Sequence, residues 1–193
     1  MKIHLIHGIH ATTPGGNTAK LAVYFRAMGH EPVVHSYGYA FASTSFLPGW
    51  TNHLNRKRAA KLAPLIADGD AVCCHSNGAA VTYCLMQLRW LSRVVMVQPA
   101  LDEDVLFPDL TRVLCIYNAF DEVVGASMIL PGNYWGGMGK LGYKGPGPHN
   151  VESWDACDPP HGLPPYKGHL DMFDRKNIAA WGTTIGSWFN NRE

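Results

Sequence analysis

The 193-residue chain is 47% hydrophobic and 16% charged, which is enough apolar sequence for one buried core, so we expect a single domain over residues 1–193. Its formal net charge is only +1 and its Lys and Arg residues are scattered, which argues against nucleic acid or an anionic membrane surface as a partner. No apolar run approaches the roughly 20 residues of a membrane span, and the N-terminus does not resemble a signal peptide, so we expect a cytoplasmic protein without a membrane span.

Short apolar runs alternate with longer amphipathic stretches over the first two-thirds of the chain. The runs are almost continuously apolar, as strands buried on both faces must be, and they predict strands at 3–7, 32–36, 71–75, 93–98 and 112–118, with a further candidate at 150–155. Helices are predicted where apolar residues recur about every 3.6 positions, as at Leu21, Tyr24, Phe25 and Met28, at Val81, Cys84, Leu85 and Leu88, and at Ile178, Trp181, Ile185 and Trp188. This alternation predicts an α/β fold, a three-layer αβα sandwich with a mainly parallel sheet.

An excursion at 125–168, rich in Gly, Pro and aromatic residues, interrupts the alternation. A long irregular segment inside a compact domain is usually functional or mobile. Its Trp135 and Trp154 have two open roles, either as an apolar wall for an acyl or aromatic group or as packing beneath a surface loop. Apolar patches around the segment are compatible with a homodimer.

The sharpest local motif lies where the strand at 71–75 meets the next helix, in the sequence His75-Ser76-Asn77-Gly78. A hydrolytic serine needs a tight strand-to-helix turn that lifts its hydroxyl out of the sheet, and the residues two positions either side of it must be small. Gly78 meets this requirement on one side. Cys74 is small on the other side, but it is not the usual glycine.

A second motif closes the first strand with His7-Gly8. A loop of this kind can point a backbone N–H at the oxyanion that develops during acyl transfer, and the residue after the nucleophile supplies another. We therefore assign the main-chain N–H groups of Ile9 and Asn77 as oxyanion donors, with His10 as a substitute for Ile9. The alternative is that Gly8 simply turns the chain.

With these motifs in place, the chain resembles the α/β-hydrolase superfamily over essentially its whole length. His7-Gly8 resembles the family's oxyanion loop, and the sequence around Ser76 resembles its nucleophile elbow. The apolar strand that ends shortly before Asp121 resembles the acid loop, and Gly168-His169 resembles the histidine loop before the closing helix. The order of serine, acid and histidine is also the family's order.

The resemblance implies a triad in which Ser76 is the nucleophile, His169 the general base and Asp121 the residue that orients and stabilises the imidazole. It also implies a sheet that lacks the family's first two strands. Cys74, in the place of a glycine, is the main departure from the motif.

Other residues compete for these roles. Asp102, Asp104 and Glu122 are alternative acids, and His149 and His161 are alternative bases. His75 either has a structural role or lines the site together with His10, Trp135 and Trp154. The set His149, Asp155, Cys157, Asp158 and His161 has the residue types of a zinc site, but its spacing matches no known pattern, so we expect no metal. No nucleotide-binding motif is present, and no cofactor is expected.

An open serine site without a cofactor fits hydrolysis of a carboxylic ester through an acyl-enzyme on Ser76, with a small-molecule or acyl-ester substrate. A thioesterase or an amidase could use the same triad. The alternative from another class is a non-catalytic, hydrolase-like binding protein, and a metal-dependent hydrolase is a third hypothesis.

Overall fold

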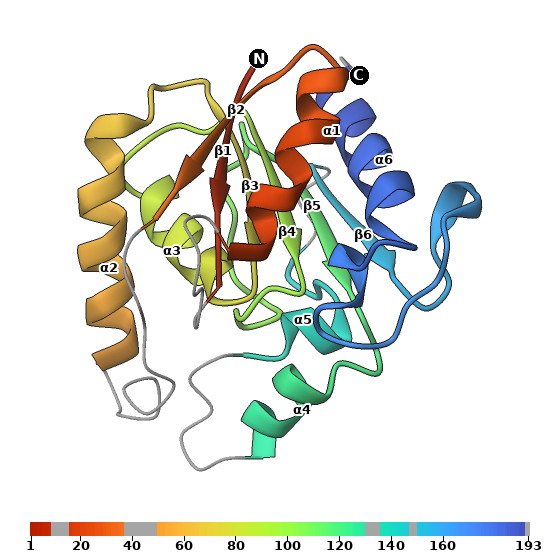
Figure 1. Ribbon diagram of the computed structural model, residues 1–193. Helices are drawn as coiled ribbons and strands as arrows, with labels where there is room; N and C mark the ends of the chain where they lie inside the picture. Colours follow the sequence, from red (N-terminus) through yellow and green to blue (C-terminus); the bar gives the residue numbers. More distant parts are fainter. Residues whose placement is uncertain (9–15, 37–49, 130–135, 147–149, 192–193) are drawn as a thin grey trace.

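The computed structural model describes residues 1–8, 16–36, 50–129, 136–146 and 150–191. Six parallel strands form one sheet in the order β2-β1-β3-β4-β5-β6 (Figure 1). The strands are β1 (Lys2–Ile6), β2 (Glu31–His35), β3 (Ala71–His75), β4 (Arg93–Val97), β5 (Arg112–Tyr117) and β6 (Val151–Asp155). The α-helices are α1 (Ala22–Ala27), α2 (Trp50–Leu62), α3 (Asn77–Met86), α4 (Glu122–Ile129), α5 (Met138–Leu141) and α6 (Ile178–Asn190). Short 3-10 turns are η1 (Gly16–Leu21), η3 (Ala63–Leu65), η4 (Pro160–Gly162) and η5 (Asp171–Phe173).

The predicted α/β class and parallel sheet are confirmed, with small changes at the strand ends. All five residues of β3 are buried, which explains why its sequence is continuously apolar. Strands β1, β2, β4 and β5 each end one residue earlier than predicted, and His7 and Ser36, for example, lie beyond the paired register. The candidate strand near residue 150 is also confirmed: β6 pairs with β5, Val151 opposite Val113.

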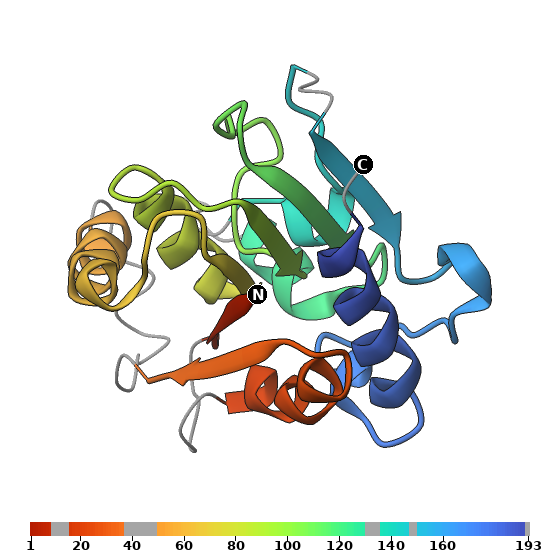
Figure 2. The same cartoon turned by 90° about the horizontal axis from the view of Figure 1, so that it is seen from above.

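Helices cover both faces of the sheet (Figure 2). Helices α1 and α6 pack together on one face, where alternate strand residues such as Leu5 and Cys73 enter a shared core with Trp181. Helices α2 and α3 pack on the other face, where the intervening residues such as Ile6 and Cys74 enter a second core. The elements therefore form three layers, as the period-2 alternation of strand side chains requires. Among the described residues, no helix has the length and apolar content needed to cross a bilayer.

The excursion at 125–168 contains more regular structure than its composition suggests. The end of α4, the short α5 and β6 all lie within it. Tyr143 packs against Phe107 with ring centroids 5.5 Å apart, in the core beside α3. Part of this segment therefore completes the sheet and its core.

Strand order determines where a site can form. The chain moves from β1 outward to β2, then crosses back to place β3 on the other side of β1. In open parallel sheets, ligands bind beyond the carboxyl ends of the strands at such a reversal. His7 and Ser76 directly follow the two strands at this point.

A row of hydrogen-bonded polar side chains, of which both histidines are buried and Asp70 is partly exposed, connects β2, β1 and the residue before β3. His4 Nδ1 lies 2.6 Å from His35 Nε2, and His4 Nε2 lies 2.9 Å from Asp70 Oδ2. Burial, together with the neighbouring His4, lowers the pKa of His35 to about 4. His35 is therefore neutral at physiological pH.

Candidate active site

Ser76 occupies a strained turn between β3 and α3. Its backbone has φ 53° and ψ −127°, and among the described residues only Gln98 and His161 are other non-glycine residues with positive φ. Such a conformation costs about 1–3 kcal/mol and persists only where surrounding contacts hold it. Here the Ser76 N–H donates to Val97 O at 3.0 Å, and Ser76 O accepts from Ala79 N and Ala100 N. The turn presents the serine at the helix N-terminus.

The residues on either side of the turn explain how the chain fits there. A Cβ added at Gly78 would lie 2.6 Å from His7 O and 2.7 Å from Ile6 O, so only glycine lets α3 approach the end of β1. Cys74 is fully buried, and its thiol lies within 3.5 Å of Val95 O, to which it donates. Burial raises the pKa of Cys74 to about 12, so this thiol is protonated at neutral pH and is not an activated nucleophile.

Two parts of the expected oxyanion site meet at Ser76. A Cβ added at Gly8 would lie 3.0 Å from Ser76 Cβ, so the His7-Gly8 loop runs directly against the serine. Asn77 is the first residue of α3, so its N–H has no acceptor within its own helix and lies at the positive end of the helix dipole. Ile9 and His10 lie outside the described residues, as does Trp135.

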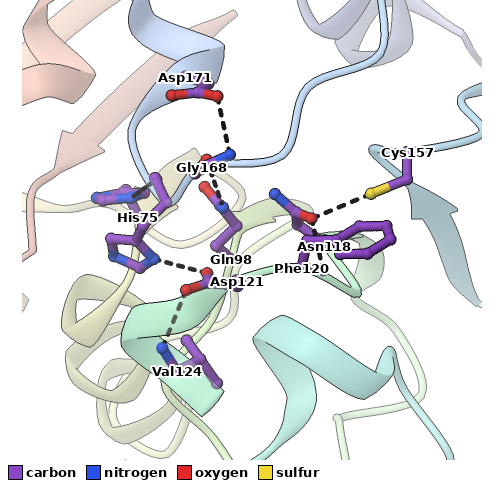
Figure 3. Close-up of polar contacts among 10 residues, drawn as sticks. His75, Gln98, Asn118, Phe120, Asp121, Val124, Cys157, Gly168 and Asp171 are labelled. Atoms are coloured by element: carbon purple, nitrogen blue, oxygen red, sulfur yellow. Dashed lines mark hydrogen bonds and ion pairs between the residues drawn. The ribbon is translucent and has the colours of Figure 1, made fainter. Parts of the chain in front are cut away.

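Asp121 and His169 are joined by a hydrogen bond of 2.7 Å between Asp121 Oδ2 and His169 Nδ1. Because a carboxylate only accepts, Nδ1 carries the proton and Nε2 is left as the basic nitrogen. The other carboxylate oxygen accepts from Val124 N at 2.9 Å, so Asp121 also caps the N-terminus of α4 (Figure 3). The carboxylate has no exposed surface, and both of its oxygens have a partner.

Ser76 is linked to this pair through its neighbour His75. The His75 and His169 rings have centroids 4.7 Å apart, and His75 Nε2–H donates to His169 O at 3.2 Å. Within the part of the chain that the structure describes, Ser76 forms no side-chain hydrogen bond with His169 itself. Catalytic hydrogen bonds are often long in ligand-free sites and shorten when substrate binds.

His75 is buried between the turn at Ser76 and the loop that carries His169. Its ring meets Phe173 edge-on at 5.0 Å on the side of η5. Burial lowers the pKa of His75 well below its usual value, and the nearby His169 contributes to the same effect. His75 is therefore neutral at physiological pH.

The acid that is hydrogen-bonded to the His169 ring is Asp121, and none of its described competitors makes that contact. Asp102 and Asp104 are exposed, and Glu122 is exposed in the first turn of α4. His161 and Trp154 contact each other edge-to-face at 5.7 Å and line a hollow beside α6, so Trp154 is not grouped with Ser76. His149 lies outside the described residues.

The described residues of the alternative zinc set are Asp155, Cys157, Asp158 and His161, and they form no metal-binding group. Cys157 Sγ–H donates to Asn118 Oδ1 (Figure 3). The Cys157 N–H donates to the Asp155 carboxylate. No group of three or more His, Cys, Asp and Glu side chains within the described ranges is placed to hold a metal ion.

Two features of the site were missed in the sequence. Asn55 of α2 and Asn77 form a reciprocal pair of amide hydrogen bonds, 3.2 and 3.4 Å long, which ties α2 to the turn after Ser76. Gln98, directly after β4, is fully buried and donates to Gly168 O at 3.3 Å. A polar residue at the carboxyl end of a buried strand, followed by Pro99, was the available signal for Gln98.

A search against models of known protein families finds no match, and a search of curated proteins also finds none.

Proposed function

We propose that the protein is a serine hydrolase of the α/β-hydrolase type that cleaves a carboxylic ester through an acyl-enzyme on Ser76. The observation that carries the proposal is the 2.7 Å hydrogen bond between buried Asp121 and His169. The His169 ring contacts the ring of His75, and the next residue is Ser76, whose φ is positive. The strained turn, the helix N-terminus and the oriented imidazole are the parts that nucleophilic acyl transfer requires.

In the proposed first step, Ser76 Oγ attacks the ester carbonyl carbon as His169 Nε2 takes its proton. The oxyanion that forms accepts from Asn77 N–H, and each such donor is worth about 3–4 kcal/mol in known cases. The C–O bond to the leaving alcohol then breaks, and His169 returns the proton to that oxygen. Asp121 stabilises the imidazolium in between.

In the second step, water attacks the acyl-enzyme and gives its proton to His169. The carboxylic acid leaves and Ser76 recovers its proton. The cycle uses the three side chains, the Asn77 main-chain N–H and water. Thioesters and amides are alternative acyl donors for the same groups, because the triad does not distinguish among them.

Labelling with a fluorophosphonate probe, followed by peptide mapping, tests the proposal. We expect the probe on Ser76 and no labelling of Ser76→Ala. The matched control is Ser92→Ala, since the Ser92 hydroxyl donates to Gly69 O before β4 begins and has no part in the proposed chemistry. Absence of labelling in the folded wild type would overturn the serine mechanism and favour the binding-protein alternative.

A further inference from the structure

The loop that carries His169 is held at two consecutive carbonyl groups. Gln98 Nε2 donates to Gly168 O at 3.3 Å, and His75 Nε2 donates to His169 O at 3.2 Å (Figure 3). The two donors come from the residue after β4 and the last residue of β3, which are neighbours in the sheet. The loop also closes on itself, because Gly168 N donates to Asp171 Oδ2 at 2.8 Å.

Both the backbone and the side chain of Gln98 cost folding free energy in this position. Its φ is 45°, a left-handed conformation that a non-glycine residue adopts at a cost of about 1–3 kcal/mol. Its side chain is completely buried, and among the described residues its Oε1 has no hydrogen-bond partner. Within the described residues, the hydrogen bond from Gln98 Nε2 to Gly168 O is the one that this side chain makes.

His75, the last residue of β3, is the second donor to the His169 loop. Its ring is fixed between Phe173 and the His169 ring, at centroid distances of 5.0 and 4.7 Å. Because a carbonyl only accepts, the proton of the neutral ring is on Nε2 and points at His169 O. The residue before Ser76 therefore sets the distance between the elbow and the histidine loop.

We propose that His75 and Gln98 are positioning residues that place the His169 imidazole between Asp121 and Ser76. The inference rests on the proposed function. A loop held at one carbonyl can still rotate about that contact, whereas two consecutive carbonyls held from two strands define its orientation. Losing either contact leaves the reacting groups intact but lets His169 Nε2 move relative to Ser76 Oγ.

Paired variants separate positioning from packing. His75→Phe keeps a ring against Phe173 and removes the donor, whereas His75→Gln retains an N–H at a similar reach. Gln98→Asn is too short to reach Gly168 O, and asparagine tolerates the left-handed region better than most residues. The matched control is His30→Phe, because His30 Nε2 makes the same kind of bond, to Gly186 O at 2.9 Å, beside α6.

The first readout is the saturating rate of fluorophosphonate labelling across pH, with thermal unfolding as the check on folding. We expect His75→Phe and Gln98→Asn to lower that rate at least about 10-fold, since small misplacement of reacting groups is costly. The probe concentration for half-saturation stays unchanged. His75→Gln restores most of the rate, and His30→Phe labels as the wild type does. Folded His75→Phe and Gln98→Asn variants that label at the wild-type rate overturn the inference; if Gln98→Asn does not fold, the His75 pair decides.

The second readout does not depend on activity. The proton that His169 Nδ1 shares with Asp121 should give a downfield NMR resonance in the wild type, which broadens in His75→Phe and is retained in His75→Gln. An unlabelled wild type with this NMR pattern refutes the hydrolase but supports the positioning of His169. A resonance that is identical in all variants refutes the positioning.

Discussion

Replacing Gly78 with alanine tests how the turn at Ser76, the proposed nucleophile, is built. The added Cβ would lie 2.6 Å from His7 O and 2.7 Å from Ile6 O, against an ordinary C···O contact of about 3.3 Å. Helix α3 must therefore move by about 0.7 Å, because both oxygens belong to the backbone at the end of a central strand and cannot rotate away. Overpacking of this kind costs about 1–3 kcal/mol. At this chain length, each kcal/mol lowers the Tm by about 2–4 °C.

Gly125→Ala is the matched control, with the opposite expected sign. Gly125 lies inside α4, and the three atoms nearest to its added Cβ all belong to the Lys140 side chain, with Nζ nearest at 3.0 Å. The end of a flexible side chain moves at little cost. Alanine is a better helix former than glycine, so we expect a gain of about 0.5–1 kcal/mol.

Urea denaturation and thermal melts of both variants give the stabilities, and probe labelling gives the consequence for the site. A displaced α3 carries Ser76 and Asn77 with it, so we expect Gly78→Ala to lose about 100-fold in labelling rate while still folded. Gly125→Ala should label normally. A Gly78→Ala protein as stable and as reactive as the wild type would refute the close approach of α3 to β1.

Asp121 has two roles, capping α4 and orienting His169, and substitutions should separate them. Asp121→Asn keeps a good N-cap for Val124 N, so it should cost little stability. It should lower the labelling rate by about 10⁴-fold, because the tautomer of His169 is no longer set. Asp121→Ala should lose the same activity and about 1 kcal/mol in addition, measured by urea denaturation. For His35, the folded-state pKa of about 4 lies below the usual 6.5, so the unfolded chain binds the proton first and stability falls as the pH is lowered from 6.5 toward 4. At about 1.4 kcal/mol per pH unit this is at most about 3 kcal/mol, and about 2 after solvent screening. Because His75 also has a lowered pKa, the urea-denaturation stability of His35→Gln should still fall below pH 6.5, but less steeply than that of the wild type. An equal slope in the two proteins would refute the contribution of His35. Ester hydrolysis should be indifferent to a metal chelator, and inhibition would favour the metal-dependent alternative.

Much of the fold could be predicted from the sequence because burial leaves a local pattern. The continuous apolar run at β3 and the 3.6-residue period around Trp181 each report the environment of their own residues. The six strands were therefore predicted to within a residue at their ends, and helices were predicted where α1, α3 and α6 lie. The elbow was equally local, because Gly78 follows Ser76 at the spacing that the turn requires. The excursion at 125–168 was harder to interpret, because its glycines and prolines conceal the short helix α5, although its strand was predicted at 150–155.

The sequence by itself therefore determined the parallel α/β class and the candidate residues Ser76, Asp121 and His169, since each follows from neighbours along the chain. Only the tertiary structure decided that His169 meets Asp121 rather than Asp102, that Trp154 faces α6, and that Gln98 holds the histidine loop. Asp121 and His169 are 48 residues apart, and Gln98 and Gly168 are 70 apart, so no local pattern in the sequence encodes their hydrogen bonds. They follow from the strand order, which brings the carboxyl ends of β3, β4 and β5 to one edge of the sheet.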